Sequence, residues 1–276
     1  MPPGKGASVR ALSDMAFNSA DPRWSDFRTR AASALVLGPV ALFCVLYGGF
    51  AWAALLLAAM AGLGWEWGTL ARLERPYLTG VALALVWAAE VFGGPAAGLS
   101  AMLIMWLGVS FSFGRFAGYC VPYAGLCGIA LIWLRQRPTG LEDTIFLVLV
   151  VWATDIGAYL AGRLLGGPKL APRISPGKTW AGSIGGLLIA AVCGALLAWV
   201  MQSSLLTAFA AGAVLSLCAQ AGDLLESAIK RKLGVKDSGR TIPGHGGLFD
   251  RLDGFLAAAP VAAVLALCVQ GGPLWQ

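Results

Sequence analysis

Charged side chains are scarce in this chain of 276 residues. Only 12% of the residues are charged, 20 of them basic and 14 acidic, whereas 58% are hydrophobic and the mean hydropathy is +0.74. A water-soluble globule could not hide so much apolar surface, so that class of protein is excluded. We expect the chain to lie in a lipid bilayer.

Histidine is almost absent, and no two cysteines have CxxC spacing. The single histidine, His245, has no cysteine near it in sequence, which argues against a zinc site. Six cysteines lie inside apolar runs and none forms a CxxC pair, so we interpret them as small buried hydrophobic residues. Residues 1–30 have no central apolar stretch, which excludes a cleavable signal peptide and predicts a largely disordered cytoplasmic tail.

Long apolar runs separated by short polar breaks predict an all-α polytopic membrane protein, because lipid cannot satisfy open backbone groups. We expect about nine transmembrane helices: about five in an N-terminal group (31–140) and the rest in a C-terminal catalytic region (141–276). The runs lie near residues 31–48, 50–71, 78–92, 95–113, 116–134, 143–165, 180–201, 205–229 and 249–270.

The distribution of positive charge predicts the orientation. With nine spans and a cytoplasmic N-terminus, every lysine and arginine except Arg135 and Arg137 falls on the cytoplasmic side. This is the bias that the positive-inside rule describes. It also makes the loops 166–179 and 230–248 cytoplasmic.

Glycines at GxxxG spacing occur twice, at Gly64 and Gly68 and at Gly182 and Gly186. This spacing lets helices approach closely, either within the chain or at a dimer face. Glu66 and Glu90 are isolated acidic residues in the N-terminal half. We interpret both as neutralised or hydrogen-bonded packing residues, with catalysis as the alternative.

Polar residues gather on shared helix faces after residue 150. Three predicted helices carry them at i, i+3, i+4 or i+7 spacing, which aligns side chains along one stripe. The stripes are Asp155, Tyr159, Gly162 and Arg163; Asp223, Glu226, Ser227 and Lys230; and Asp250 with Asp253. Carboxylates at similar depth would repel one another unless a hard cation such as Mg²⁺ lay among them, or unless each paired with a neighbouring base such as Arg251.

The loop 166–179 favours phosphate binding. "GKT" at 177–179 is similar to a P-loop, but that motif requires glycine at position 172, which is proline, and no strand is predicted before it. What remains is a series of cations and hydroxyls that leads into a helix N-terminus, where phosphate binds well. The series contains Lys169, Arg173, Ser175, Lys178 and Thr179.

A second polar loop, "KDSGRTIPGHGGLFDRLD", runs from Lys236 to Asp253. Its glycines permit close backbone approach, and free N–H groups are expected at the start of the helix that follows. We expect His245 to donate a hydrogen bond to phosphate or to orient the loop.

The stretch Ser227–Asp253 resembles the signature of the phosphatidate cytidylyltransferases, also called CDP-diacylglycerol synthases. It contains S-x-x-K-R, then K-D after four residues, then H-G-G-x-x-D-R-x-D. Residues 155–186 resemble the family's preceding region. The resemblance implies a reaction in which CTP and phosphatidic acid give CDP-diacylglycerol and pyrophosphate.

With that reaction in view, we predict site residues in three groups. The expected Mg²⁺ ligands are Asp223, Asp250, Asp253 and Asp155; the groups at phosphate are Lys230, Arg231, Lys236 and His245, with Asp237 holding these cations; and the CTP-binding residues are Ser175, Lys178, Thr179 and Arg163. A second, monovalent cation is an open alternative. The lipid phosphate is already anionic near neutral pH, so no strong general base is required.

The expected partners are CTP, phosphatidic acid and membrane lipid, with no nucleic acid. The resemblance also suggests a homodimer and a bacterial plasma membrane location, with the active site facing the cytoplasm. Three alternatives remain at this stage: an ion-coupled transporter, a related CTP-dependent lipid kinase or ether-lipid cytidylyltransferase, and a helical scaffold. Against the transporter, the ionisable groups gather at one membrane face and the two halves show no repeat.

Overall fold

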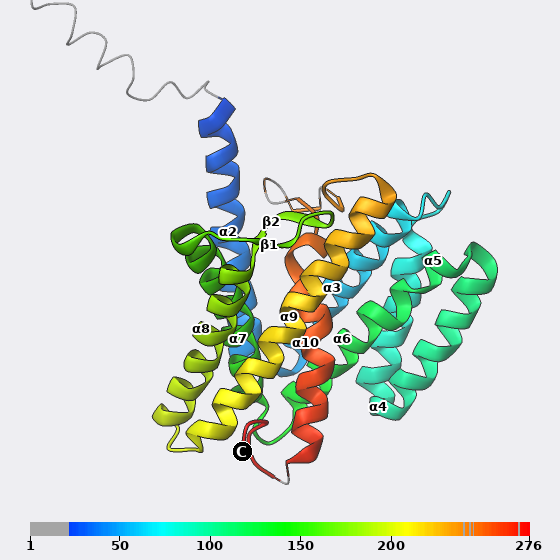
Figure 1. Ribbon diagram of the computed structural model, residues 1–276. Helices are drawn as coiled ribbons and strands as arrows, with labels where there is room; N and C mark the ends of the chain where they lie inside the picture. The colour runs from blue at the N-terminus through cyan, green and yellow to red at the C-terminus, as the bar shows by residue number, and fades with distance from the viewer. Residues whose placement is uncertain (1–21, 240, 243, 245, 270) are drawn as a thin grey trace, which may run out of the picture.

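Helices dominate the computed structural model, which describes residues 22–239, 241–242, 244, 246–269 and 271–276 (Figure 1). His245 and Arg240 lie outside the described residues. The helices are α2 (Pro22–Tyr47), α3 (Gly49–Leu70), α4 (Tyr77–Phe113), α5 (Arg115–Gly118), α6 (Cys120–Gln136), α7 (Gly140–Leu165), α8 (Trp180–Val200), α9 (Leu205–Leu233) and α10 (Phe249–Cys268).

Seven helical segments in the described part of the chain are long and apolar enough to cross a membrane: α3, α4, α5 together with α6, α7, α8, α9 and α10. The multi-pass membrane class predicted from composition is therefore confirmed. We expected nine spans, and the two spans that are missing from the seven segments are accounted for by α4 and α2. The 37 residues of α4 count as one helix, and the apolar part of α2 covers only Leu35–Tyr47.

The α4 helix is bent back on itself at Gly94, where φ is 76° and the next residue is Pro95. A Cβ atom placed on Gly98 would lie 3.0 Å from the Cβ of Glu90. Eight residues of straight helix would separate these positions by about 12 Å along the axis. The two arms of α4 thus correspond to the separate predicted spans 78–92 and 95–113.

Two segments differ from the sequence-based expectation. Helix α2 already begins at Pro22, so the prediction of disorder up to residue 30 is wrong for residues 22–30. The loop 166–179 contains two short antiparallel strands, β1 (Lys169–Ala171) and β2 (Ser175–Thr179), so the fold is not purely helical. Turn and strand formation in so short a loop leaves little periodic signal in the sequence.

The glycine pairs bring helices together within the chain. A Cβ on Gly182 would lie 2.8 Å from the Ala158 carbonyl oxygen of α7, and one on Gly186 would lie 2.7 Å from that of Thr154. Gly64 of α3 lies equally close to the backbone of α4 at Gly80. Both GxxxG pairs are therefore occupied by intramolecular packing, and neither supports the dimer-face alternative.

The bundle has two distinct ends. The β-hairpin, the C-terminal end of α9 and the first turn of α10 lie at the same end as the start of α2, whereas the chain terminates at the opposite end (Figure 1). Arg137 lies at that opposite end, where it donates to the Gly272 carbonyl oxygen (3.0 Å) and pairs with Asp143 (2.5 Å). Arg135 donates to the Val45 carbonyl oxygen at the end of α2 (3.0 Å). The two arginines predicted to lie outside thus share one end of the molecule.

Candidate active site

A polar cavity of about 610 Å³ lies between α7, α8 and α9, beside β2. Five of the predicted site residues line it: Asp155, Arg163, Lys178, Thr179 and Asp223. Ser175, the first residue of β2, is not among the lining residues. The stripe on α7, the hairpin and Asp223 of the α9 stripe meet at this cavity.

Neutral polar side chains join the helices around the cavity. Ser183 of α8 donates to Gln220 Oε1 of α9 (2.5 Å), and Gln220 returns a hydrogen bond to the Ser183 carbonyl oxygen (3.2 Å). Thr154 of α7 donates to Ser216 of α9 (2.9 Å). These bonds cross three helices in a low-dielectric interior, and we expect them to fix the helix positions.

The N-terminus of α8 opens onto this cavity. Thr179 is the N-cap of α8, and its Oγ1 accepts a hydrogen bond from the Gly182 N–H (3.1 Å). Thr179 is largely buried, with 7% of its surface exposed. The remaining first-turn N–H groups of α8 make the wall electropositive, which suits a phosphate group.

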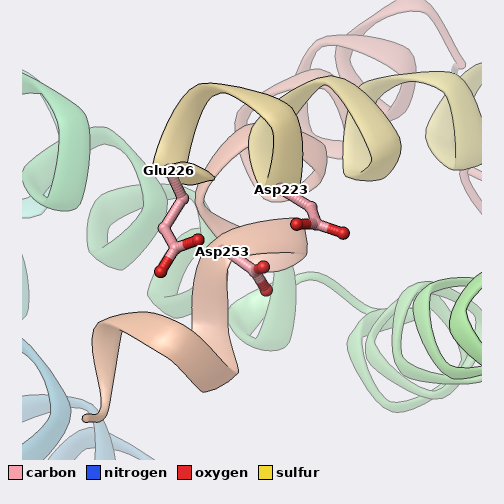
Figure 2. A group of neighbouring side chains, drawn as sticks. All are labelled: Asp223, Glu226 and Asp253. Carbon is pink, nitrogen blue, oxygen red and sulfur yellow. The ribbon is translucent and has the colours of Figure 1, made fainter. Parts of the chain in front are cut away.

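Three carboxylates converge next to the cavity: Asp223 and Glu226 on α9 and Asp253 on α10 (Figure 2). An oxygen from each lies within 4.8 Å of the others. We call these three residues the carboxylate cluster. The close approach of the two helices at Gly222 brings them together, since a Cβ there would lie 2.4 Å from the Asp253 carbonyl oxygen.

Two lysines face the carboxylate cluster. Lys178 of β2 forms an ion pair with Asp223, and Lys230 Nζ lies 2.7 Å from Glu226 Oε1 and 2.8 Å from Asp250 Oδ1. Lys230 thus contacts two carboxylates, Glu226 and Asp250. The acidic side chains around these two lysines therefore outnumber them. Three carboxylates in so small a volume fit a divalent cation, and ligands that are all oxygen suit Mg²⁺.

Asp250 is not one of the three residues of the carboxylate cluster, although the sequence grouped it with Asp253 and it shares Lys230 with Glu226. Its side chain accepts hydrogen bonds from Lys230 Nζ (2.8 Å), the Ser238 N–H (3.0 Å) and the Gly247 N–H (3.0 Å). Asp250 therefore holds Lys230 and the loop before α10 in place. The i, i+3 spacing places both aspartates on one side of α10, and Asp250 contacts Lys230 of α9, but only Asp253 joins Asp223 and Glu226 in a group of oxygens within 4.8 Å of one another.

The remaining predicted residues occupy varied surroundings. Arg163 donates to the Tyr159 hydroxyl (2.7 Å) at the cavity, and Arg231 donates to the Ile174 carbonyl oxygen (3.2 Å) in the β-hairpin. Lys236 is exposed. Among the described residues Asp237 forms no ion pair, and Lys230 is held by Glu226 and Asp250 instead. The prediction for His245 lies outside the described residues.

Comparison with known proteins gives the family. The model of the cytidylyltransferase family matches residues 28–269. The chain belongs to the cytidylyltransferase family. It is also 40% identical over 255 residues to the phosphatidate cytidylyltransferases of Brucella suis and Brucella melitensis, a match that covers 85% of this chain and 91% of each relative. The enzyme of the same name from Staphylococcus saprophyticus is 42% identical over 158 residues, or 55% of this chain and 59% of the relative.

Membership of the cytidylyltransferase family confirms the resemblance stated from residues 227–253 and makes the chain an enzyme. The transporter and scaffold alternatives are thereby set aside.

This cytidylyltransferase has a second cavity, of about 690 Å³, on the other side of α9. Its lining is mostly apolar: Trp67, Phe116, Tyr119, Pro122, Tyr123, Leu126, Leu225, Ile229, Lys232 and Leu233. At about 100° per residue, Leu225 and Ile229 project roughly opposite to Gln220 and Leu224, which line the polar cavity. Helix α9 therefore separates a polar cavity from an apolar one.

Two acidic residues of this region, Glu226 and Glu66, were not among the site residues predicted from the sequence. Glu226 was recognised in the α9 stripe but left out of the predicted metal ligands, although its i, i+3 relation to Asp223 was a usable signal. Glu66, from the N-terminal half, contacts the loop before α10. That contact spans more than 170 residues, and no local pattern indicates it. Its hydrogen-bonded packing role was predicted correctly.

Proposed function

We propose that this enzyme transfers the cytidylyl group of CTP to phosphatidic acid, which yields CDP-diacylglycerol and pyrophosphate. The observation that carries the proposal is the carboxylate cluster on α9 and α10, whose Asp223 lines the polar cavity, while an apolar cavity lies on the other side of α9. The two substrates differ in the same way, since one is a water-soluble triphosphate and the other a lipid. The name of the Brucella relatives supports the same reaction.

The polar cavity suits the nucleotide. Lys178, Arg163 and the first turn of α8 supply positive charge for the triphosphate. Lys178 is paired with Asp223 and is therefore already directed at the carboxylate cluster. The Oγ1 of Thr179 accepts a hydrogen bond from the Gly182 N–H and so holds the end of α8 in place, while its hydroxyl hydrogen can be donated to the ligand.

The apolar cavity suits the diacylglycerol part of the lipid. Tyr119, Leu126 and Leu225 at this cavity are exposed large hydrophobic residues, so acyl chains can reach it from the bilayer. Lys232 adds one cation for the lipid phosphate, and the buried Tyr123 hydroxyl has no hydrogen-bond partner among the described residues. A buried hydroxyl without a partner is costly, and a phosphate oxygen would satisfy it.

In the reaction, a phosphate oxygen of phosphatidic acid attacks the α-phosphorus of CTP, a new P–O bond forms, and the bond to the β-phosphate breaks. The pair of electrons leaves with pyrophosphate, and no proton has to be abstracted from the dianionic lipid phosphate. Asp223, Glu226 and Asp253 would hold a Mg²⁺ ion, which supplies charge neutralisation to the phosphates when bound. Lys178 and Lys230, both paired with members of the carboxylate cluster, orient the phosphate groups beside it and keep the carboxylates in position.

The seven long apolar segments give nine membrane crossings if the two arms of α4 are counted separately and α2 is added, and nine crossings fit this function. The start of α2, the β-hairpin and the loop before α10 then lie on the cytoplasmic side, where CTP is available. The basic residues of these segments and the location of Arg135 and Arg137 at the other end support that orientation. The bacterial relatives support a plasma membrane location.

The test uses purified full-length protein in mixed micelles with phosphatidic acid, Mg²⁺ and labelled CTP. We expect pyrophosphate and a lipid-soluble cytidine product, both dependent on the lipid and abolished by EDTA. Asp253→Asn should remove activity and also the rise in thermal midpoint that Mg²⁺ gives to the wild type. Asp143→Asn, a matched buried aspartate at the other end of the bundle, should retain the Mg²⁺ effect. Activity of Asp253→Asn equal to wild type would refute the assignment of the carboxylate cluster.

A further inference from the structure

Glu66 of α3 is buried, with 2% of its surface exposed, yet it lies in the N-terminal half of the chain, far in sequence from the cavity residues. Four donors from one other region surround its carboxylate. Leu248 N–H donates to Oε1 (2.7 Å), Phe249 N–H donates to Oε2 (2.8 Å), Ser238 Oγ donates to Oε2 (3.2 Å), and the Thr241 hydroxyl donates to Oε1.

Two of these donors belong to the start of α10. Leu248 is its N-cap residue and has no side-chain cap of its own, so Glu66 caps the helix from outside. A carboxylate at a helix N-terminus is also favoured by the helix dipole. The loop backbone approaches it closely, because a Cβ on Gly239 would lie 3.0 Å from Glu66 Oε1 and one on Gly247 would lie 2.8 Å from Oε2. The loop is therefore wrapped around this one side chain.

The contacts continue from Glu66 to the carboxylate cluster. Ser238, whose hydroxyl binds Glu66, donates its N–H to Asp250 (3.0 Å), and Asp250 accepts from Lys230 (2.8 Å). Lys230 in turn lies 2.7 Å from Glu226. A chain of buried or half-buried polar groups thus joins α3 to the cluster on α9 and α10, and its first two links depend on the position of Ser238 in the loop.

We propose that Glu66 is a positioning residue, which fixes Ser238, Thr241 and the start of α10, and thereby the arrangement of Asp250, Lys230 and the carboxylate cluster. Its effect on catalysis rests on the proposed function, whereas its effect on the loop does not. Replacement by glutamine keeps the volume but puts an NH₂ group opposite donors on one side of the carboxyl. At least two hydrogen bonds to the carboxylate are then lost or repulsive.

The experiment compares wild type, Glu66→Gln and Glu90→Gln in detergent. Glu90 is a matched control because it is also buried (1% exposed) in a membrane helix, but its carboxylate has no hydrogen-bond partner among the described residues. The first readout is limited trypsin digestion, with cleavage after the exposed Lys236 followed by mass spectrometry. It needs neither substrate nor metal.

We expect cleavage after Lys236 to be roughly tenfold faster or more in Glu66→Gln, the factor that loss of a hydrogen bond to a charged group gives. Glu90→Gln should be cleaved at the wild-type rate. The second readout is turnover: kcat of Glu66→Gln should fall at least tenfold while KM for CTP changes less than threefold, because the polar cavity is lined by other elements.

Cleavage of Glu66→Gln at the wild-type rate would overturn the proposal, and so would a fall in kcat without faster cleavage. If no variant, wild type included, forms a lipid-soluble cytidine product, then the proposed function fails while the digestion still tests the loop. Should Glu66→Gln not fold, Ser238→Ala removes one donor and leaves the helix cap. It is expected to accelerate cleavage about threefold, and an unchanged rate in Ser238→Ala would count against the proposal.

Discussion

Gly222→Ala should separate α9 from α10 at the carboxylate cluster. The added Cβ would lie 2.4 Å from the Asp253 carbonyl oxygen and 2.9 Å from the Ala257 Cβ, whereas ordinary contacts begin at 3.4 Å. The first of these atoms is backbone and cannot rotate away, so α10 has to move by about 1 Å, a displacement that overpacking in a close-packed interior commonly forces at a cost of about 1–3 kcal/mol.

The displacement acts directly on the cluster because Asp223 and Asp253 adjoin the clash. A misplacement of about 1 Å in a catalytic constellation costs roughly 10²-fold in rate. We therefore expect the initial rate of lipid cytidylylation to fall about a hundredfold, and the Mg²⁺ concentration for half-maximal rate to rise. The thermal midpoint should drop by only a few degrees, since the overpacking cost is small compared with the stability of the bundle.

Gly108→Ala is the matched control. Gly108 also lies in a membrane helix, α4, but a Cβ there meets no described heavy atom within 4 Å, so activity and Mg²⁺ dependence should be unchanged. The reasoning is refuted if Gly222→Ala retains a rate within threefold of wild type at every Mg²⁺ concentration. In that case the close approach of α9 and α10 would not determine the geometry of the cluster.

Three further substitutions test other parts of the structure. Lys230→Met should lower kcat by roughly 10²–10³-fold, with partial recovery in Lys230→Arg, because it removes the cation between two carboxylates; a kinetic comparison at saturating CTP checks this. Asp143→Ala leaves the guanidinium of Arg137 without its buried partner and should destabilise the protein by about 3–5 kcal/mol, seen as a lower thermal midpoint, with kcat per folded molecule unchanged. Trp275→Ala removes a buried ring stacked on Phe146 at 4.4 Å and should cost about 3–5 kcal/mol in the same thermal assay; an unchanged midpoint would contradict the packing argument.

Much of the architecture follows from the apolar runs, because backbone groups in lipid must be hydrogen-bonded within a helix. Only the positions of the helix ends then remain to be determined. Separate apolar runs on either side of Gly94 and Pro95 indicate the two arms of α4 from sequence alone. The stripes on α7 and α9 predict which polar residues share a helix face, since residues spaced by three, four or seven do so. Strands β1 and β2 were not anticipated, because eight residues in a basic loop carry too little periodicity.

The exact ligand set could not be read in the same way. Spacing places Asp250 and Asp253 on one side of α10, but which of them joins Asp223 and Glu226 depends on the rotation of one helix against the other. That rotation is decided by Gly222, where the backbones almost touch. The contact of Glu66 with residues 238–249 is likewise a product of tertiary packing, and only a set of coordinates reveals it.

Helix α9 separates the polar cavity from the apolar cavity, so the rotation of α9 about its axis decides which side chains line each cavity. Insertion of a single residue after Gln220 would turn the rest of the helix by about 100° and carry every later side chain out of its compartment. Apolar side chains would then face the polar cavity, and acidic side chains would face the apolar cavity. An insertion of seven residues, close to two full turns, would restore the angle but shift the acids by about 10 Å along the axis. We therefore expect α9 to tolerate the exchange of residues better than their insertion or deletion.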